Sequence, residues 1–245
     1  MKQITDLVFP EINYAFPMVF VEGTKGIPYL FGVDEEKQEI NVSDFYISKF
    51  LVTQKLWDYI MGTHPANNNA GEMPVVKASY DSILGKNGFL EKFNVKVRAA
   101  GYEPGPHSKF RLPTETEWEY AARGGIHWKD NFTYSGSNNI DEVAWYLNNG
   151  KREIKAVGQK KPNQLGIYDM CGNVWEWCHD HFTPDTNNIP KDGTPCLLES
   201  NDRVLRGGCN HNWAIHCTVS KRYEIPPEYF DTDIGFRVAL SLKKR

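Results

Sequence analysis

The sequence lacks an excess of positive charge and any long hydrophobic run. Its formal net charge is −3 over 245 residues, so it has no basic surface of the kind that contacts nucleic-acid phosphates. No stretch is apolar enough to span a membrane. Asp6, Pro10 and Glu11 interrupt the apolar N-terminal residues, unlike a secretory signal. We therefore expect neither a nucleic-acid nor a membrane partner, and a cytoplasmic location.

Cysteine is also scarce, with five residues in the chain. In a reducing compartment these are expected to be thiols rather than a disulfide framework. Hydrophobic residues make up 40% and charged residues 24%, which is typical of a soluble globular protein. The 20 glycines and 14 prolines predict many turns and few long helices.

The first half of the chain carries the clearest secondary-structure signals. Residues 18–21, 29–31 and 40–50 have the apolar runs or alternation of strands. A helix is predicted from Thr53 to Gly62, and another between residues 79 and 93, broken or kinked near Gly85 and Gly88.

A further helix is predicted within residues 111–125, where Thr114 and Glu117 form a capping box. Gly124 can take the left-handed conformation that ends a helix. Residues 125–245 contain no convincing helix, so irregular β structure is expected there. These patterns predict an α+β protein with one domain, residues 1–245, in which residues 1–16 form an N-terminal extension.

Four segments in register carry a resemblance to a known family. They read FYISKFLVTQ at 45–54, RLPTETEWEYAARGG at 111–125, NQLGIYDMCGNVWEW at 163–177, and RVLRGG at 203–208 leading to GFR at 235–237. Together they resemble the formylglycine-generating-enzyme (sulfatase-modifying factor) family. The resemblance implies a C-type-lectin-like fold with much irregular structure. It does not imply one activity, because the family includes oxidases and pure binding proteins.

The resemblance also implies a structural calcium site in the GNVWEW segment. Asn173 and Glu176 match the motif and offer hard oxygen ligands. Glu176 lies between two tryptophans, and a buried carboxylate must be paired, protonated or metal-bound. The alternative is therefore that Glu176 pairs with an arginine, such as Arg206 or Arg237.

The family's oxidases convert a protein cysteine to formylglycine with copper(I) held by two cysteines. Their pattern is Arg-Gly-Gly, three residues, Cys, four residues, Cys, and here those positions are Asn212 and Cys217. An amide cannot replace a thiolate for copper(I), so copper binding and catalysis are not expected. The alternative function is a copper-dependent oxidase in which Cys217 and a displaced partner, Cys209, are the catalytic residues.

The sequence contains two other sets of residues that could bind a metal. Zinc accepts thiolate and imidazole, but the spacing of Cys209, His211, His216 and Cys217 matches no zinc pattern. If the Cys-His-Asp-His run at 178–181 is extended, its two histidines share one face, but the resemblance implies a plain polar loop there. Neither site is expected, and Cys217 is interpreted as a small buried apolar side chain.

The segment between Gly208 and Gly235 has an unusual codon property. Many of its residues can arise from an AAC codon when adenines are replaced, which is the signature of retroelement-diversified variable proteins of this fold. Four residues, Trp213, Lys221, Glu224 and Glu228, cannot arise that way and are interpreted as framework. Among the residues that can are His211, Asn212, Ile215, His216, Thr218, Tyr223, Ile225, Tyr229, Phe230, Asp231, Thr232 and Asp233.

These observations predict a non-catalytic ligand- or protein-binding domain. Its binding face would be residues 209–233, hereafter the 209–233 segment, with a protein or small molecule as ligand. Either a retroelement diversifies this face or it is an undiversified binding or scaffold surface. Trp213, Tyr223, Tyr229 and Phe230 are the expected contact aromatics, with core packing as the alternative for Trp213.

Overall fold

The structure, a computed structural model, describes residues 5–33, 37–63, 71–105 and 108–242. It has the α+β composition that the sequence predicts, and the strands lie in three sheets. In chain order the helices and strands are β1 (Asp6–Phe9), β2 (Tyr14–Val21), β3 (Tyr29–Phe31), β4 (Gln38–Ile40), β5 (Phe45–Ser48), α1 (Gln54–Met61), α2 (Tyr80–Leu84), α3 (Phe89–Ala99), β6 (Phe110–Arg111), α4 (Glu115–Ala122), α5 (Ile140–Val143), β7 (Trp175–His181), β8 (Arg203–Arg206), β9 (Arg222–Ile225), β10 (Ile234–Gly235) and β11 (Ala239–Ser241).

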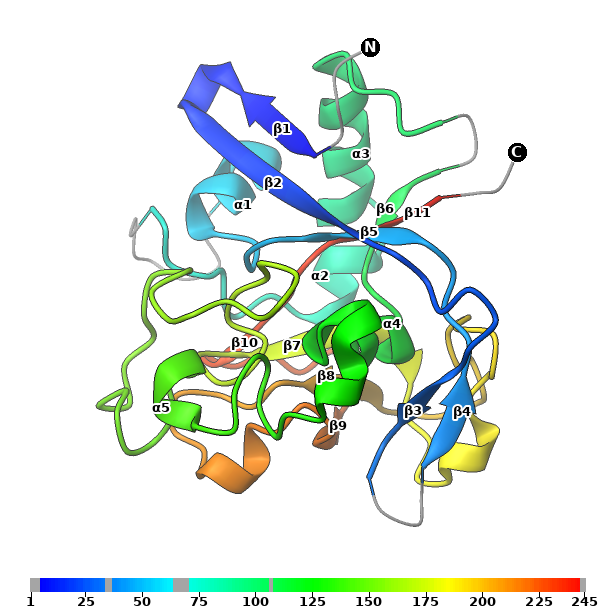
Figure 1. The fold of residues 1–245 in the computed structure, drawn as a ribbon. Helices are drawn as coiled ribbons and strands as arrows, with labels where there is room; N and C mark the ends of the chain where they lie inside the picture. Colours follow the sequence, from blue (N-terminus) through cyan, green and yellow to red (C-terminus); the bar gives the residue numbers. More distant parts are fainter. Residues whose placement is uncertain (1–4, 34–36, 64–70, 106–107, 243–245) are drawn as a thin grey trace.

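The larger sheet has five strands in the order β1-β2-β5-β11-β6, and every neighbouring pair is antiparallel. The second sheet has the order β10-β7-β8-β9, with β10 parallel to β7. Strands β3 and β4 pair separately. Figure 1 shows the five-stranded sheet with α1 and α3 at one end of the molecule and the second sheet below it, with α4 beside them.

Residues 6–16 pair and pack with the rest of the described fold. Strand β1 and the first half of β2 form a hairpin at the edge of the five-stranded sheet. Leu7, Phe9 and Phe16 from this hairpin are buried in the core cluster that also contains Phe93 of α3. Phe16 and Phe93 meet edge-on, with ring centroids 5.8 Å apart.

The helices of the first half begin where the sequence predicts, but α3 continues to Ala99, beyond the predicted end at residue 93. The Thr53 side chain accepts a hydrogen bond from the Leu56 N–H at the start of α1, and Gly62 ends the helix with φ 73°. The expected break near Gly85 and Gly88 separates α2 from α3. A Cβ at Gly88 would lie 2.8 Å from the Gly85 carbonyl oxygen, so the chain needs a glycine to pass this point.

Helix α4 carries the complete capping box between Thr114 and Glu117 that the sequence predicts. Every residue of α4 is buried, including Glu115 and Glu119. Its C-cap is Arg123 rather than Gly124, although Gly124 does have a left-handed conformation with φ 86°. The helix contacts β3, β7 and β8, so it lies at the centre of the second core cluster.

Three expectations for the remaining chain were wrong. Residues 125–245 contain the short helix α5, capped by the Asn139 side chain, together with 3₁₀ turns. The predicted strand at 40–50 is two strands, β4 and β5, that belong to different sheets. The run at 178–181, expected as a polar loop, continues β7 to His181, which pairs with Arg203 of β8.

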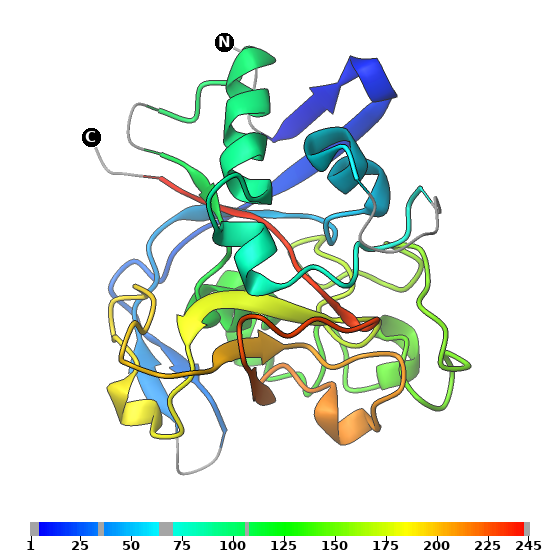
Figure 2. The ribbon, with the colours of Figure 1, turned by 180° about the vertical axis from the view of Figure 1, so that it is seen from behind.

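The 209–233 segment connects β8 to β10 and includes β9. In both Figure 1 and Figure 2 it lies, in orange and red-orange, at the opposite end of the molecule from α3. All five cysteines are buried free thiols. Within the part of the chain that the structure describes, no helix is long and apolar enough to cross a membrane.

Candidate functional site

The 209–233 segment leaves β8 through two glycines with left-handed backbones. Gly207 has φ 94° and Gly208 has φ 75°, a conformation that other residues rarely adopt. A Cβ on Gly208 would lie 2.6 Å from the His216 carbonyl oxygen and 2.8 Å from Cys217 Sγ. The chain therefore folds back closely on itself between residues 208 and 217.

The start of β7 supports both ends of this segment. The Asn210 N–H donates to the Asn173 carbonyl at 3.0 Å, and the Trp175 N–H donates to the Asp233 carbonyl at 2.8 Å. The Leu147 N–H also donates to the Asn212 carbonyl at 3.0 Å. Two loops that are distant in sequence are thus held by main-chain hydrogen bonds beside one strand.

A hollow of about 340 Å³ opens between these loops. Trp175 and Tyr223 stack along it, with ring centroids 5.4 Å apart and an interplanar angle of 27°. Leu205 and Ile234 supply apolar lining from β8 and β10. The predicted face residues that line it are His211, Asn212, His216, Tyr223, Ile225, Tyr229, Asp231 and Asp233.

The other predicted contact residues lie outside the hollow. Trp213, Ile215 and Phe230 have 61%, 71% and 59% of their surface exposed. The core-packing alternative for Trp213 is therefore wrong. Thr218 is partly buried and Thr232 is exposed, and neither lines the hollow.

The positions that hold copper in the family's oxidases have no second thiol here. Asn212 Oδ1 accepts hydrogen bonds from the Cys209 N–H at 3.0 Å and from Cys209 Sγ at 3.1 Å. Cys217 is fully buried, and its Sγ lies 3.9 Å from the Cys209 carbonyl oxygen. Burial raises the pKa of the Cys217 thiol to about 12 and also raises that of Cys209. Both groups are therefore thiols at neutral pH, as expected of small buried side chains.

Glu176 has an arginine partner, which was the alternative to calcium. Arg237 donates from Nε to Glu176 Oε2 at 2.6 Å and from a terminal nitrogen to Oε1 at 2.8 Å. Trp118 Nε1 donates to Oε2 at 2.8 Å, and all three residues are buried. The Asn173 side chain is engaged with the main chain of Lys155. These two side chains do not fit the implied calcium site, because a guanidinium already covers both carboxylate oxygens. Calcium binding by the chain stays a prediction that a calcium titration would test.

A second buried charge network surrounds α4, and the sequence reasoning missed it. Arg206 donates to Glu115 at 2.9 Å and to Glu119 at 2.6 Å. Arg222 also pairs with Glu115 at 2.7 Å, and Arg123 pairs with Glu119 at 2.8 Å. The available signal was the pair Glu115 and Glu119, four residues apart on one face of a helix that also carries apolar residues. The network connects α4 to β8 and β9 and so fixes the base of the 209–233 segment.

The 178–181 run does not gather a metal site among the described residues. Asp180 lies inside and accepts from the Glu115 and Cys196 N–H groups at 2.7 and 2.8 Å. Burial, followed by the nearby Glu115 charge, raises the pKa of Asp180 to about 8. His181 Nδ1 lies 2.8 Å from the Leu198 carbonyl oxygen.

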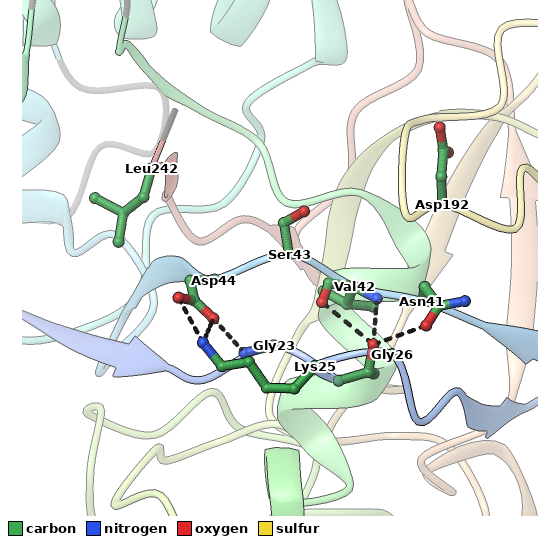
Figure 3. A pocket seen from close by; sticks show the side chains of 10 residues that line it. Gly23, Lys25, Gly26, Asn41, Val42, Ser43, Asp44, Asp192 and Leu242 are labelled. Atoms are coloured by element: carbon green, nitrogen blue, oxygen red, sulfur yellow. Dashed lines mark hydrogen bonds and ion pairs between the residues drawn. The ribbon is translucent and has the colours of Figure 1, made fainter. Parts of the chain in front are cut away.

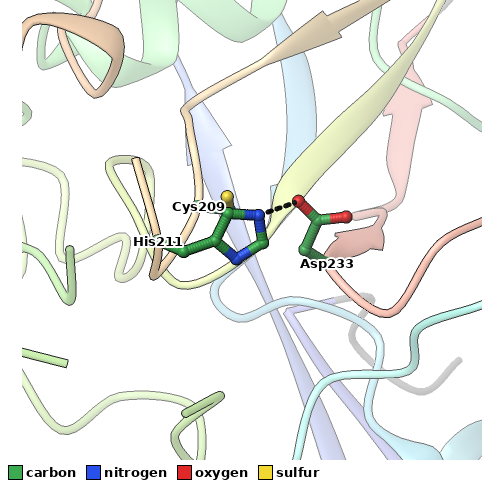
Figure 4. Close-up of side chains that lie close together, drawn as sticks. All are labelled: Cys209, His211 and Asp233. Carbon is green, nitrogen blue, oxygen red and sulfur yellow. Dashed lines mark ion pairs between the residues drawn. The ribbon is translucent and has the colours of Figure 1, made fainter. Parts of the chain in front are cut away.

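The four-residue zinc alternative is also not formed as drawn on the sequence. Cys209 and His211 do come together, but with Asp233 rather than with His216 and Cys217. Figure 4 shows the three side chains, with the His211 ring against the Asp233 carboxylate. The distance from His211 Nε2 to Asp233 Oδ2 is 3.1 Å.

A larger hollow, about 510 Å³, lies elsewhere, between residues 23–26 and 41–44. Figure 3 shows that its Lys25 side chain is paired with Asp44, at 2.9 Å. Thr24 is hydrogen-bonded to Asn41 and Val42. None of the predicted site residues lines this hollow.

Comparison with known proteins shows the family to which the chain belongs. A profile of the sulfatase-modifying factor enzyme 1-like domain matches residues 17–242. The chain belongs to this family. The chaperone protein LppX of Paenibacillus barcinonensis is 39% identical, over 61% of this chain and 67% of that protein. The formylglycine-generating enzyme of Streptomyces coelicolor is 35% identical over 53% of this chain. The match covers 46% of that enzyme, so the chain spans about half its length.

Two solved structures share the fold. Treponema denticola variable protein 1 superposes with a TM-score of 0.81 at 26% identity, over 97% of this chain and 99% of that protein. PvdO from Pseudomonas aeruginosa superposes with a TM-score of 0.74 at 20% identity, over 99% of this chain. The predicted C-type-lectin-like fold of the formylglycine-generating-enzyme type is confirmed.

Proposed function

We propose that this family member is a non-catalytic binding domain whose binding face is the 209–233 segment. One observation carries the proposal. Eight of the residues that can each arise from an AAC codon line one hollow, and the apolar ones outside it, Ile215 and Phe230, are exposed. A surface of this kind can change its side chains without disturbing the core.

The chemistry of the face suits a protein or small-molecule ligand. Tyr223, Tyr229 and Phe230 offer exposed aromatic surface with few rotatable bonds, which lowers the entropic cost of contact. Asp231 and Asp233 add acceptors at the wall of the hollow. Exposed apolar groups beside a polar hollow are typical of interaction sites rather than of free surface.

We further propose that a retroelement diversifies this face. The codon pattern and the close superposition on a variable protein support it. Sequencing the gene in sibling strains tests the idea. Substitutions should concentrate at the codon-related positions and spare framework residues such as Lys221 and Glu224. Identical sequences throughout, with no template repeat beside the gene, would contradict diversification but would leave the binding face standing.

The binding proposal itself can be tested with a displayed library. In this library, each codon-related position would be encoded by an AAC codon in which the adenines are randomised. Clones would be selected for binding to a defined probe protein such as hen egg-white lysozyme. A matched library would randomise as many exposed positions around α3, including Glu91, Lys96 and Arg98. The face library should yield specific binders that unfold within about 1 kcal/mol of the parent, since surface substitutions change stability little. Loss of cooperative unfolding in most clones, or equal yields from both libraries, would reject the face.

The alternative, a copper-dependent oxidase, is supported by the enzyme relatives alone. The side chain at position 212 is an amide that already accepts from Cys209, and Cys217 has no second thiolate at the family position. Copper(I)-loaded protein incubated with a cysteine-containing sulfatase peptide should leave the peptide unmodified by mass spectrometry. Formylglycine that forms with the parent and is lost in Cys217→Ala would make the chain an enzyme.

A further inference from the structure

Three metal-ligating side chains meet at the hollow, and the proposed binding function does not use them as a unit. Cys209 Sγ, His211 Nε2 and a carboxylate oxygen of Asp233 all lie within 4.8 Å of one another. They come from two loops, one directly after β8 and one directly before β10. Figure 4 shows a ring nitrogen of His211 facing the Asp233 carboxylate, with the Cys209 sulfur beside the ring.

The His211 ring is oriented for a cation at this position. Its Nδ1 lies 3.0 Å from Asn210 Oδ1, an oxygen that can only accept, so Nδ1 carries a proton. In neutral imidazole Nε2 then has its lone pair directed at Asp233, which is also an acceptor. A cation between Nε2, the carboxylate and the sulfur would bind all three groups, and the hydrogen bond from Cys209 Sγ to Asn212 Oδ1 would be lost when the thiolate forms. An outer hydrogen bond that fixes the tautomer of a histidine is usual for metal ligands.

Both loops are held in place by other parts of the fold. The Asn210 N–H donates to the Asn173 carbonyl, and the Trp175 N–H donates to the Asp233 carbonyl. The Cys209 N–H donates to the Asn212 side chain at 3.0 Å. The three ligand atoms are therefore positioned without a metal, so a cation would not have to bear the full cost of ordering two loops.

The ligand types select the kind of cation. Thiolate, imidazole and carboxylate together suit zinc, whereas copper(I) prefers soft ligands and calcium prefers oxygen alone. One thiolate and one carboxylate together balance the charge of a divalent ion. This balance lowers the cost of placing the ion next to the buried Cys209. Three protein ligands leave one position of a tetrahedron free. Because His211 and Asp233 line the hollow, that position borders it.

We propose that Cys209, His211 and Asp233 bind a zinc-type divalent cation with one coordination position open to the hollow. The Cys209 proton is released to solvent when the thiolate binds. The ion would join the loops on either side of the binding face and offer a ligand's oxygen or nitrogen atom a direct bond. His211 and Asp233 belong to the codon-related positions, so under diversification this metal site is a property of this variant.

Cobalt(II) is the probe for the test, because thiolate ligation gives it an intense near-ultraviolet charge-transfer band. Protein stripped with a chelator should take up one equivalent of cobalt or zinc, measured by elemental analysis after dialysis, and show that band. Cys209→Ser should lose the band, and Asp233→Asn should weaken binding by at least about 10-fold. Cys217→Ser, which removes a neighbouring buried thiol outside the cluster, should keep both band and affinity.

Positioning by Asn210 gives an independent readout. Asn210→Ala removes the partner of His211 Nδ1 and should lower the affinity by about 10- to 100-fold while the band is kept. Metal-free unfolding curves of all variants show whether each is folded. No uptake by the parent would overturn the site, as would a band that survives in Cys209→Ser or is lost in folded Cys217→Ser. These results do not depend on whether library clones bind a protein, so the two proposals can fail separately.

Discussion

At the residue scale, the buried carboxylate of Asp169 illustrates how the irregular half of the chain is held. Asp169 lies in a turn with φ 58° and accepts a hydrogen bond from the Gly158 N–H at 2.7 Å. Burial raises its pKa to about 6, against the opposing effects of that hydrogen bond and of the Arg237 charge. An ordinary unfolded Asp has a pKa of about 3.9. The folded protein thus holds a proton here over a pH range in which the unfolded chain does not.

This difference predicts a specific pH dependence of stability. The contribution of Asp169 to the free energy of unfolding is fully present below about pH 4 and is lost as the pH rises through about 6. Asp169→Asn keeps an oxygen for the Gly158 N–H and tolerates the positive φ, but it cannot ionise. The free energy of unfolding of the parent minus that of the variant should therefore fall between pH 4 and pH 7 in urea titrations. A constant difference over that range would contradict the assignment.

At the element scale, the turn after β8 decides where the 209–233 segment can go. Gly207 and Gly208 both have a positive φ, and Gly208 passes within contact distance of the chain at His216 and Cys217. Helix α4 anchors the same strand through the pairs of Arg206 with Glu115 and Glu119. The close approach therefore forms between two parts of the chain that are already fixed.

Gly208→Ala should destabilise the protein by about 2–4 kcal/mol. About 1 kcal/mol comes from the left-handed backbone, and the rest from the methyl group forced against His216 and Cys217. Gly26→Ala is the matched control, since Gly26 has φ 83° with nothing within 4 Å of an added Cβ. It should cost about 1 kcal/mol in chemical denaturation. Equal losses in the two variants would mean that backbone strain alone, and not the close approach, requires Gly208.

At the scale of the whole molecule, the N-terminal hairpin forms one edge of the larger sheet. Phe9 of β1 packs against Tyr59 and Phe93, with ring centroids 5.5 and 6.1 Å apart. The side chain of the preceding Val8 is 41% exposed, because successive residues of a strand face opposite sides. The hairpin therefore contributes one face to the core although it precedes the family-matched region at residue 17.

Phe9→Ala should lower the free energy of unfolding by about 3–5 kcal/mol, as is usual when a large aromatic side chain is removed from a core. Val8→Ala, on the solvent face of the same strand, should change it by less than about 1 kcal/mol. Urea denaturation followed by fluorescence and circular dichroism measures both. A small effect of Phe9→Ala would mean that the hairpin is dispensable and that the domain begins near residue 17.

Much of the fold could be predicted, because its signals are local. A cap at Thr53 or a capping box between Thr114 and Glu117 depends on residues three positions apart, and the structure forms both. The C-type-lectin-like fold was predicted from the family resemblance that the four segments carry. Local signals failed for β7, which continues to His181 because the neighbouring β8 and the buried Asp180 favour it.

The sequence by itself determined the helices of the first half, the absence of a second thiol at position 212, and the segment that carries the candidate face. Only the tertiary structure decided that Glu176 pairs with Arg237, that Trp213 is exposed, and that Asp233 joins Cys209 and His211. The physical reason is distance along the chain. A capping residue finds its partner within one turn. By contrast, Glu176 meets Arg237, and Asp233 meets Cys209 and His211, because β7, β8 and β10 belong to one sheet.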